Sequence, residues 1–308
     1  MAGRWAARFG MGRRMAAGID VGAGEVRVAV LSRHGQRAGV RVEGLAAEPV
    51  GQPDGIDELR WAAVGHALAA AAARLSARGV RCDARGVMAL PDDGMRTAML
   101  DLAGRDDIAE AARQAAERVS GLAPDSIAFD WRHDAGARPG EIAIAVAPQA
   151  ELQRRVDAAA LAGIDLTAID GESIAALRAL RYAALHELDA HEPYFAIWFG
   201  DVGVRGWWVD GQAAVQDFAF PDRAHAALPD ALRTFARRPA SCAFVAGDAR
   251  CLARFGVSQA DIGDVLGAIT LPFECVHWAG DAAAAARDDL YSPAFAVAFG
   301  LALRGVWE

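Results

Sequence analysis

The first ninety residues alternate between apolar strands and one long helix. Residues 16–22 are almost entirely apolar and end at a glycine, and residues 25–31 alternate apolar and polar positions. These patterns are typical of two strands joined by a tight turn. Residues 39–47 indicate a weaker third strand, and residues 55–76 carry apolar side chains at helical spacing, with Gly79 beyond them. The start of the chain therefore predicts a three-stranded meander followed by a helix.

The middle of the chain interrupts this organisation. Residues 86–90 form a short apolar run that Pro91 closes. The pattern then predicts a strand, a helix and two strands, at residues 97–102, 107–119, 126–132 and 141–146. This group of elements predicts an inserted subdomain. A helix, a strand and a helix complete the first half, at residues 149–162, 166–169 and 172–188.

The second half repeats the pattern of the first. Residues 194–199 are an apolar strand followed by Asp201-Val202-Gly203, just as the first strand ends in Asp20-Val21-Gly22. The elements predicted after this turn are strands, helices and a terminal helix, at residues 206–209, 212–218, 223–237, 242–246, 248–255 and 293–304. The two Asp-x-Gly turns lie about 180 residues apart and predict an internal duplication.

The amino-acid composition excludes several classes of mechanism and ligand. The 308 residues suit two domains or two similar halves, and the chain carries a formal net charge of −8. All 32 basic residues counted as Lys or Arg are arginines, which excludes mechanisms that need a lysine, such as a Schiff base or a P-loop lysine. The acidic balance argues against nucleic-acid binding, because neutralising phosphates requires a concentrated basic face.

The cysteines and apolar runs bear on compartment and membrane status. Four cysteines give no disulfide framework, so a reducing compartment is favoured. A zinc site built from Cys242, Cys251, Cys275 and His277 lacks the usual close pairs, and ordinary buried thiols are the better interpretation. No apolar run reaches the roughly 20 residues of a membrane-spanning helix. Residues 1–15 are arginine-rich and are expected to be a flexible leader or, alternatively, a short membrane-surface helix.

The paired glycine turns are the features that carry chemistry. Glycine lets backbone N–H groups approach phosphate oxygens, and an aspartate can orient a hydrated magnesium ion. The same aspartates could instead be turn formers whose carboxylates accept backbone N–H groups. A third feature is the strand at residues 244–247, which leads through Gly247 into a helix where an adenosine could rest. The three turns predict a nucleotide cleft between the halves.

Five segments together resemble one protein family. Residues 18–27 resemble the first phosphate turn of actin, heat-shock chaperones and sugar kinases, in the form seen in the PilM family of cytoplasmic type IV pilus assembly proteins. Residues 88–91 look like the entry to that family's inserted subdomain, and residues 162–170 are similar to its return to the core. Residues 199–203 resemble its second phosphate turn, and residues 292–305 its last helix.

The resemblance implies an α/β actin-like fold, two duplicated ribonuclease H-like domains as in the cell-division protein FtsA, with a small subdomain inserted in the first half. It implies a first domain over residues 16–192, with the insertion at about 92–147. The second domain would span residues 193–308, and its C-terminal helix would return to the first domain.

The resemblance also implies a function. The chain is expected to be a cytoplasmic scaffold that binds the cytoplasmic tail of a PilN-like inner-membrane protein, together with other components of a type IV pilus or competence machinery. It would associate with the inner membrane peripherally, through these partners. ATP with Mg²⁺ is the implied cofactor, and no catalytic or metal-ligating residue is predicted. The candidate nucleotide-binding residues are Asp20, Gly22, Gly24, Asp201, Gly203 and Gly247.

The sequence departs from the family pattern in these turns. Ala23 and Gly24 stand where small hydroxyl residues are usual, Glu25 adds a negative charge, and Arg27 replaces the usual lysine. Because a phosphate site depends on several convergent donors, these changes predict degenerate or weak ATP binding. Two alternatives stay open: an active ATPase or small-molecule kinase that uses Asp20 or Asp201, and an FtsA-like filament former.

Overall fold

The computed structural model describes residues 13–35, 39–51, 57–81, 85–102, 107–133, 140–211, 213–221, 227–281, 283 and 287–308. The chain divides into two compact units, residues 1–89 with 158–308 and residues 90–157. Most of the leader expected at residues 1–15 lies outside the described residues. Its last three residues do not fit the expectation, because Arg13–Met15 already belong to the first strand.

The first sheet of the larger unit begins with the predicted meander. Strands β1 (Arg13–Val21), β2 (Glu25–His34) and β3 (Val40–Pro49) run antiparallel, and β4 (Gly86–Leu90) pairs with β1 in parallel. With β8 (Leu166–Gly171) the order is β3-β2-β1-β4-β8. Alternate apolar side chains of β1 and β2 pack against helix α1 (Asp57–Ala77) and the end of α3 (Gln149–Leu161).

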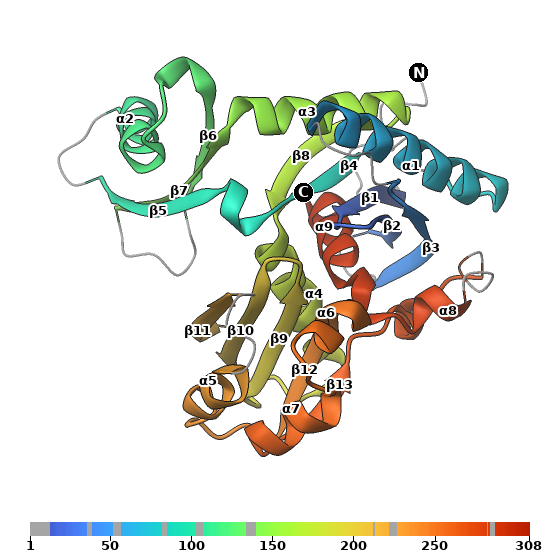
Figure 1. Cartoon of the computed structure of the whole chain (residues 1–308), viewed down its shortest axis with the longest axis vertical. Coiled ribbons are helices and arrows are strands. Elements are labelled where there is room, and N and C mark those ends of the chain that lie inside the picture. Colours follow the sequence, from blue (N-terminus) through green and yellow to red (C-terminus); the bar gives the residue numbers. More distant parts are fainter. Residues whose placement is uncertain are drawn as a thin grey trace. The chain divides into compact units, whose positions relative to one another are not determined.

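The second sheet repeats this topology. Strands β9 (Tyr194–Gly200), β10 (Gly203–Asp210) and β11 (Ala213–Pro221) form an antiparallel meander, and β12 (Cys242–Gly247) pairs with β9 in parallel. With β13 (Ile269–Pro272) the order is β11-β10-β9-β12-β13, which matches the first sheet (Figure 1). One face packs against the short helices α5 (Leu228–Phe235), α6 (Ala249–Arg254) and α7 (Gln259–Leu266). The predicted duplication is therefore present in the fold.

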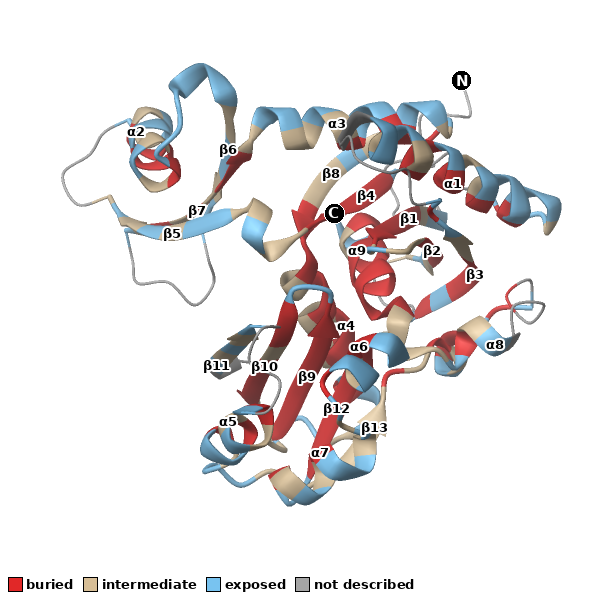
Figure 2. Cartoon of the chain, viewed as in Figure 1, coloured by how far each residue is buried: buried red, intermediate tan, exposed pale blue. Residues whose placement is uncertain are grey.

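Two helices join the sheets into one core. Helix α4 (Glu172–Glu187) follows the first sheet, and α9 (Ala296–Trp307) packs on strand β1. Figure 2 shows α9 buried along almost its whole length. Close approach requires glycine at both contacts of α9: a Cβ on Gly18 of β1 would lie 1.9 Å from the Ala298 carbonyl oxygen, and a Cβ on Gly300 would lie 1.9 Å from that of Ala175 on α4.

The smaller unit is a three-stranded sheet with one helix. Strands β5 (Arg96–Asp101), β7 (Glu141–Pro148) and β6 (Ile127–Arg132) pair antiparallel in the order β5-β7-β6. Helix α2 (Ile108–Ser120) covers one face, where alternate residues of β7 are buried. Its first turn is capped by the Asp107 side chain, and Gly121 ends it in the left-handed conformation. Trp131 packs against this small core.

Four elements in the second half of the chain differ from the sequence prediction. Helix α7 and strand β13 were not predicted, because both are short and neither has a clear apolar period. A usable signal was present, since Ser258 and Asp261 form a capping box at the start of α7. Helix α5 begins at Leu228, later than predicted, and residues 222–226 lie outside the described residues. The terminal helix begins at Ala296 after a 3-10 turn.

Candidate functional site

The three predicted turns meet between the two sheets. The β1–β2 turn carries Gly22 and follows Asp20, the β9–β10 turn carries Asp201, and Gly247 ends β12. These four residues line one small cavity, together with Arg27, Glu172, Asp248 and Cys251 among others. The structure therefore brings four of the six candidate residues together, and their nucleotide role stays a prediction.

The other two candidates lie beside the cavity and do not line it. A Cβ on Gly24 would lie 3.2 Å from Nη1 of Arg250, so this glycine borders a charged side chain. Gly203 has a φ of +148°, and a Cβ there would lie 2.3 Å from the carbonyl oxygen of Phe220 on the neighbouring strand β11. Strand pairing alone therefore explains the glycine at position 203.

Arg27 is the central residue of the site, and its ion pairs join the two halves. Its guanidinium lies 3.3 Å from a carboxylate oxygen of Asp20 on β1 and 2.5 Å from one of Asp248 at the start of α6. It also forms an ion pair with Glu25 on its own strand. The Arg27 side chain is only 8% exposed. In the sequence, Arg27 stands where the family has a lysine, and only the structure shows that it bridges to the second half.

Further polar contacts join the first half of the chain to the second half. The backbone N–H of Ala23 in the first turn donates to Asp201 in the second turn, at 2.6 Å. Arg250 of α6 lies 2.7 Å from Asp248 and 3.6 Å from Glu25. Asp248 also caps α6, because its side chain accepts from the Arg250 backbone N–H. We call the five residues Asp20, Glu25, Arg27, Asp248 and Arg250 the ion-pair cluster.

Burial and charge shift the titration of this cluster. Burial raises the pKa of Asp20 to about 6, although the neighbouring Arg27 opposes the shift. Burial by itself lowers the pKa of Arg27, but the three carboxylates around it raise the pKa above its ordinary value. Burial also acts to raise the pKa of Asp248, but hydrogen bonds from Arg250 outweigh it and hold this pKa below its usual value. The cluster is therefore a charged network that depends on Arg27.

The net charge around the cavity opposes a phosphate. Three guanidinium groups lie here, on Arg27, Arg250 and Arg254, and the Arg254 group donates to the backbone carbonyls of Gly200 and Asp201. Five carboxylates accompany them, on Asp20, Glu25, Glu172, Asp201 and Asp248. Five negative and three positive groups give a formal charge of −2, whereas a triphosphate needs a positive environment.

The size of the cavity also opposes a nucleotide. Its volume is about 20 Å³, which is the space that one water molecule needs. Sites for cofactors and small ligands enclose roughly 300–1,000 Å³. The turn also offers few donors, because the Ala23 N–H is already bonded to Asp201. In this closed arrangement the residues present do not fit ATP.

Among the described residues, no group of three or more His, Cys, Asp or Glu side chains is arranged to hold a metal ion. Cys242, Cys251 and Cys275 are free and buried, and burial raises the pKa of each thiol. Cys82 lies outside the described residues. Within the same described ranges, no helix combines the length and apolar character needed to cross a bilayer.

Comparisons with known proteins identify the fold. No family model and no curated protein matches the chain. A chain of a PilM–PilN type IV pilus biogenesis complex matches with a TM-score of 0.68 and 19% identity, covering 94% of this chain and 98% of that one. The cytoplasmic domain of EpsL, an inner-membrane component of the type II secretion system of Vibrio cholerae, matches with a TM-score of 0.41 and 9% identity, over 76% and 82%. A Bacteroides thetaiotaomicron protein with an actin-like ATPase fold matches with a TM-score of 0.47 and 7% identity, over 84% and 91%. The predicted resemblance is thus confirmed for the fold, which this chain shares with the chain of the PilM–PilN complex.

Proposed function

We propose that the chain is a PilM-like scaffold of a type IV pilus or competence machinery. In this role it binds the cytoplasmic tail of a PilN-like inner-membrane protein and contacts other assembly components. It lies in the cytoplasm and associates with the inner membrane through these partners. The likeness to a chain of a PilM–PilN complex over nearly the whole length of both chains supports the proposal.

The observation that carries the non-enzymatic role is the closed cleft. A kinase or ATPase must hold a triphosphate in line with its acceptor and neutralise the charge that develops during transfer. Here the space between the turns has the size of one water molecule, and Arg27 crosses it to reach Asp248. The fold is retained, while its cleft is occupied by the protein's own charges.

Energetics favour weak ATP binding for the same reason. Separating Arg27 from Asp248 breaks a hydrogen bond between charged groups, which contributes about 1.5–3 kcal/mol, while Asp20, Glu25 and Arg250 still compensate the two charges. A nucleotide that enters the cleft has to separate Arg27 from Asp248 and Ala23 from Asp201. At about 1.4 kcal/mol per tenfold change, the ion pair alone weakens nucleotide affinity by about one to two orders of magnitude. Degenerate ATP binding therefore follows from the ion-pair cluster.

A pull-down tests the partner. The cytoplasmic tail of a PilN-like protein from the same organism is immobilised as a synthetic peptide, and a scrambled peptide of the same composition serves as the control. We expect saturable binding of the full chain to the native tail alone. Absence of binding at about 50 µM protein would overturn the proposal.

A nucleotide titration separates the scaffold from the enzyme. Calorimetry with ATP and Mg²⁺ should show no micromolar binding to the unmodified chain. Micromolar binding that is lost in Asp20→Ala would instead favour the active ATPase or kinase. Sedimentation at increasing protein concentration tests the FtsA-like alternative, which requires polymers.

A further inference from the structure

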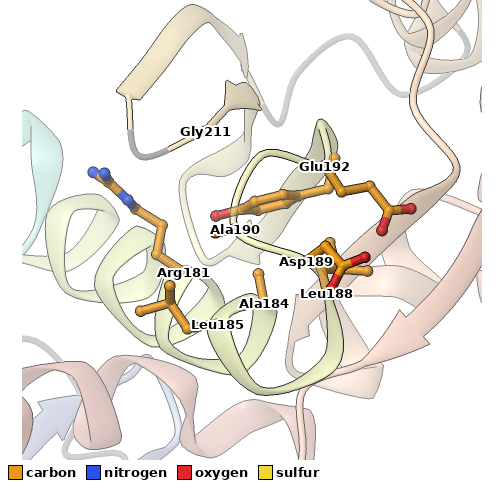
Figure 3. A pocket seen from close by; sticks show the side chains of 9 residues that line it. Arg181, Ala184, Leu185, Leu188, Asp189, Ala190, Glu192 and Gly211 are labelled. Carbon is orange, nitrogen blue, oxygen red and sulfur yellow. The ribbon is translucent and has the colours of Figure 1, made fainter.

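A second pocket lies at the opposite end of strand β9 from the ion-pair cluster. Strand β9 ends at Gly200 beside the nucleotide cleft and begins at Tyr194, whose side chain lines this pocket. The six residue steps between these positions correspond to about 20 Å. The pocket has a volume of about 220 Å³ and lies between the end of α4 and the β10–β11 turn (Figure 3). It is therefore separate from the cleft.

One end of the pocket presents two hydrogen-bond donors. Tyr194 is 5% exposed, and within the described residues no side chain or backbone group bonds to its hydroxyl. Burial raises its pKa to about 12, so the hydroxyl keeps its proton and can donate. The charge of Arg181 partly opposes this shift, and both side chains line the same pocket. Arg181 itself forms no ion pair with any described residue.

These two donors favour an anionic ligand group. Tyr194 lines the pocket, so a ligand oxygen there can accept a hydrogen bond from its hydroxyl, and hydrogen bonds to charged acceptors are stronger than those to neutral ones. A carboxylate can accept from the Tyr194 hydroxyl and pair with the Arg181 guanidinium at the same time. This end of the pocket therefore matches one acidic side chain.

The rest of the pocket changes from apolar to acidic. Ala184, Leu185 and Leu188 of α4 and the segment after it form its wall, and Leu185 is 59% exposed. Asp189 and Glu192 lie at the end away from Arg181, as Figure 3 shows. The Ser241 hydroxyl already donates to Glu192. The lining thus runs from cationic through apolar to anionic.

The length of this gradient excludes a free amino acid. The six residue steps from Arg181 to Glu187, the last residue of α4, rise about 9 Å at 1.5 Å per residue, and Asp189 lies beyond that end of the helix. A single amino acid does not span that distance between its charged groups, whereas three residues of an extended peptide do. We propose that this pocket binds a peptide segment of a partner protein in which an apolar residue separates an acidic residue from a basic one. The acidic side chain is held by Arg181 and Tyr194, and the proposal goes beyond the binding of a PilN-like tail.

Fluorescence anisotropy with defined peptides tests the site on the full chain. The probes are fluorescein-labelled glycine-glutamate-leucine-arginine-glycine, its reverse, and both sequences with glutamine in place of glutamate. The two orders are needed because the strand direction of the peptide is not fixed by the pocket. We expect one glutamate peptide to bind with a Kd below about 1 mM and its glutamine counterpart to bind about tenfold more weakly.

Two variants identify the residues. Tyr194→Phe keeps the aromatic ring, which lies 5.6 Å from that of Phe244, and removes only the hydroxyl. Arg181→Gln removes the charge, and Arg60→Gln, at an exposed position of α1, is the matched control. We expect each pocket variant to weaken the glutamate peptide about tenfold and the control to change nothing. Melting temperatures verify that the variants are folded.

Two results would overturn the proposal: no saturable binding of either glutamate peptide, or binding that Arg181→Gln and Tyr194→Phe leave unchanged. The PilN-like tail should bind all three variants equally. Failure of this site and failure of the proposed scaffold function are therefore distinguishable.

Discussion

The raised pKa of Asp20 makes a quantitative prediction about stability. Its folded pKa of about 6 lies above the ordinary aspartate pKa of 3.8, so the folded protein binds the proton more tightly than the unfolded chain does. Stability contributed by the protonated group is complete below the unfolded pKa and is lost as the pH rises towards and through 6. The full loss is about 3 kcal/mol, because one pKa unit corresponds to 1.36 kcal/mol. About half of this loss falls between pH 5 and pH 8.

Substitution of Asp20 by Asn removes this titration and preserves the side-chain shape. We expect the unmodified chain to lose about 1–2 kcal/mol more of its free energy of unfolding between pH 5 and pH 8 than Asp20→Asn does. Urea unfolding at the two pH values, followed by tryptophan fluorescence, measures this difference. The same substitution at the exposed Asp264 on α7 is the control. If the free energy of unfolding of Asp20→Asn and of the unmodified chain depended identically on pH, burial would not disfavour the ionised form of Asp20, and the prediction would be refuted.

Three further substitutions test other contacts. Arg27→Met should lower the free energy of unfolding at pH 8 by about 3–5 kcal/mol in urea titrations, because three carboxylates lose their shared cation; a loss below about 1 kcal/mol would contradict the ion-pair cluster. Gly18→Val should abolish soluble expression, since its Cβ would collide with the backbone of α9; a folded variant would contradict this packing. Asp107→Ala should destabilise α2 by about 1 kcal/mol, seen as faster amide hydrogen exchange in that helix alone.

Much of the fold could be predicted because its central strands have strong local patterns. Strand β9 is buried at every position, and its apolar run is visible in the sequence without knowledge of any partner. The repetition of this run with Asp-x-Gly predicted the duplicated topology. Strand β13 was missed because its four residues acquire their structure from pairing with β12. Local periodicity carries no information about such a contact.

The site was only partly predictable for a related reason. The Asp-x-Gly motif, repeated after an apolar strand in each half, predicts matching positions for Asp20 and Asp201, and in the structure both line one cavity. The bridge from Arg27 to Asp248 joins residues 221 positions apart, and a single sequence does not reveal such a pairing. Gly203 was assigned to phosphate binding, whereas the neighbouring strand β11 is sufficient to require a glycine there. Charge pairing and strand packing are tertiary effects that the motif alone does not specify.

The burial of α9 against β1 has a consequence for synthesis on the ribosome. Strand β1 leaves the exit tunnel about 280 residues before the helix that covers it. At roughly 5–20 residues per second, its apolar face waits tens of seconds for that cover. During this interval the nascent chain exposes an apolar sheet face that can aggregate. The yield of folded protein in cells should therefore depend on chaperones that shield nascent chains. Slower translation of the second half should lengthen this dependence.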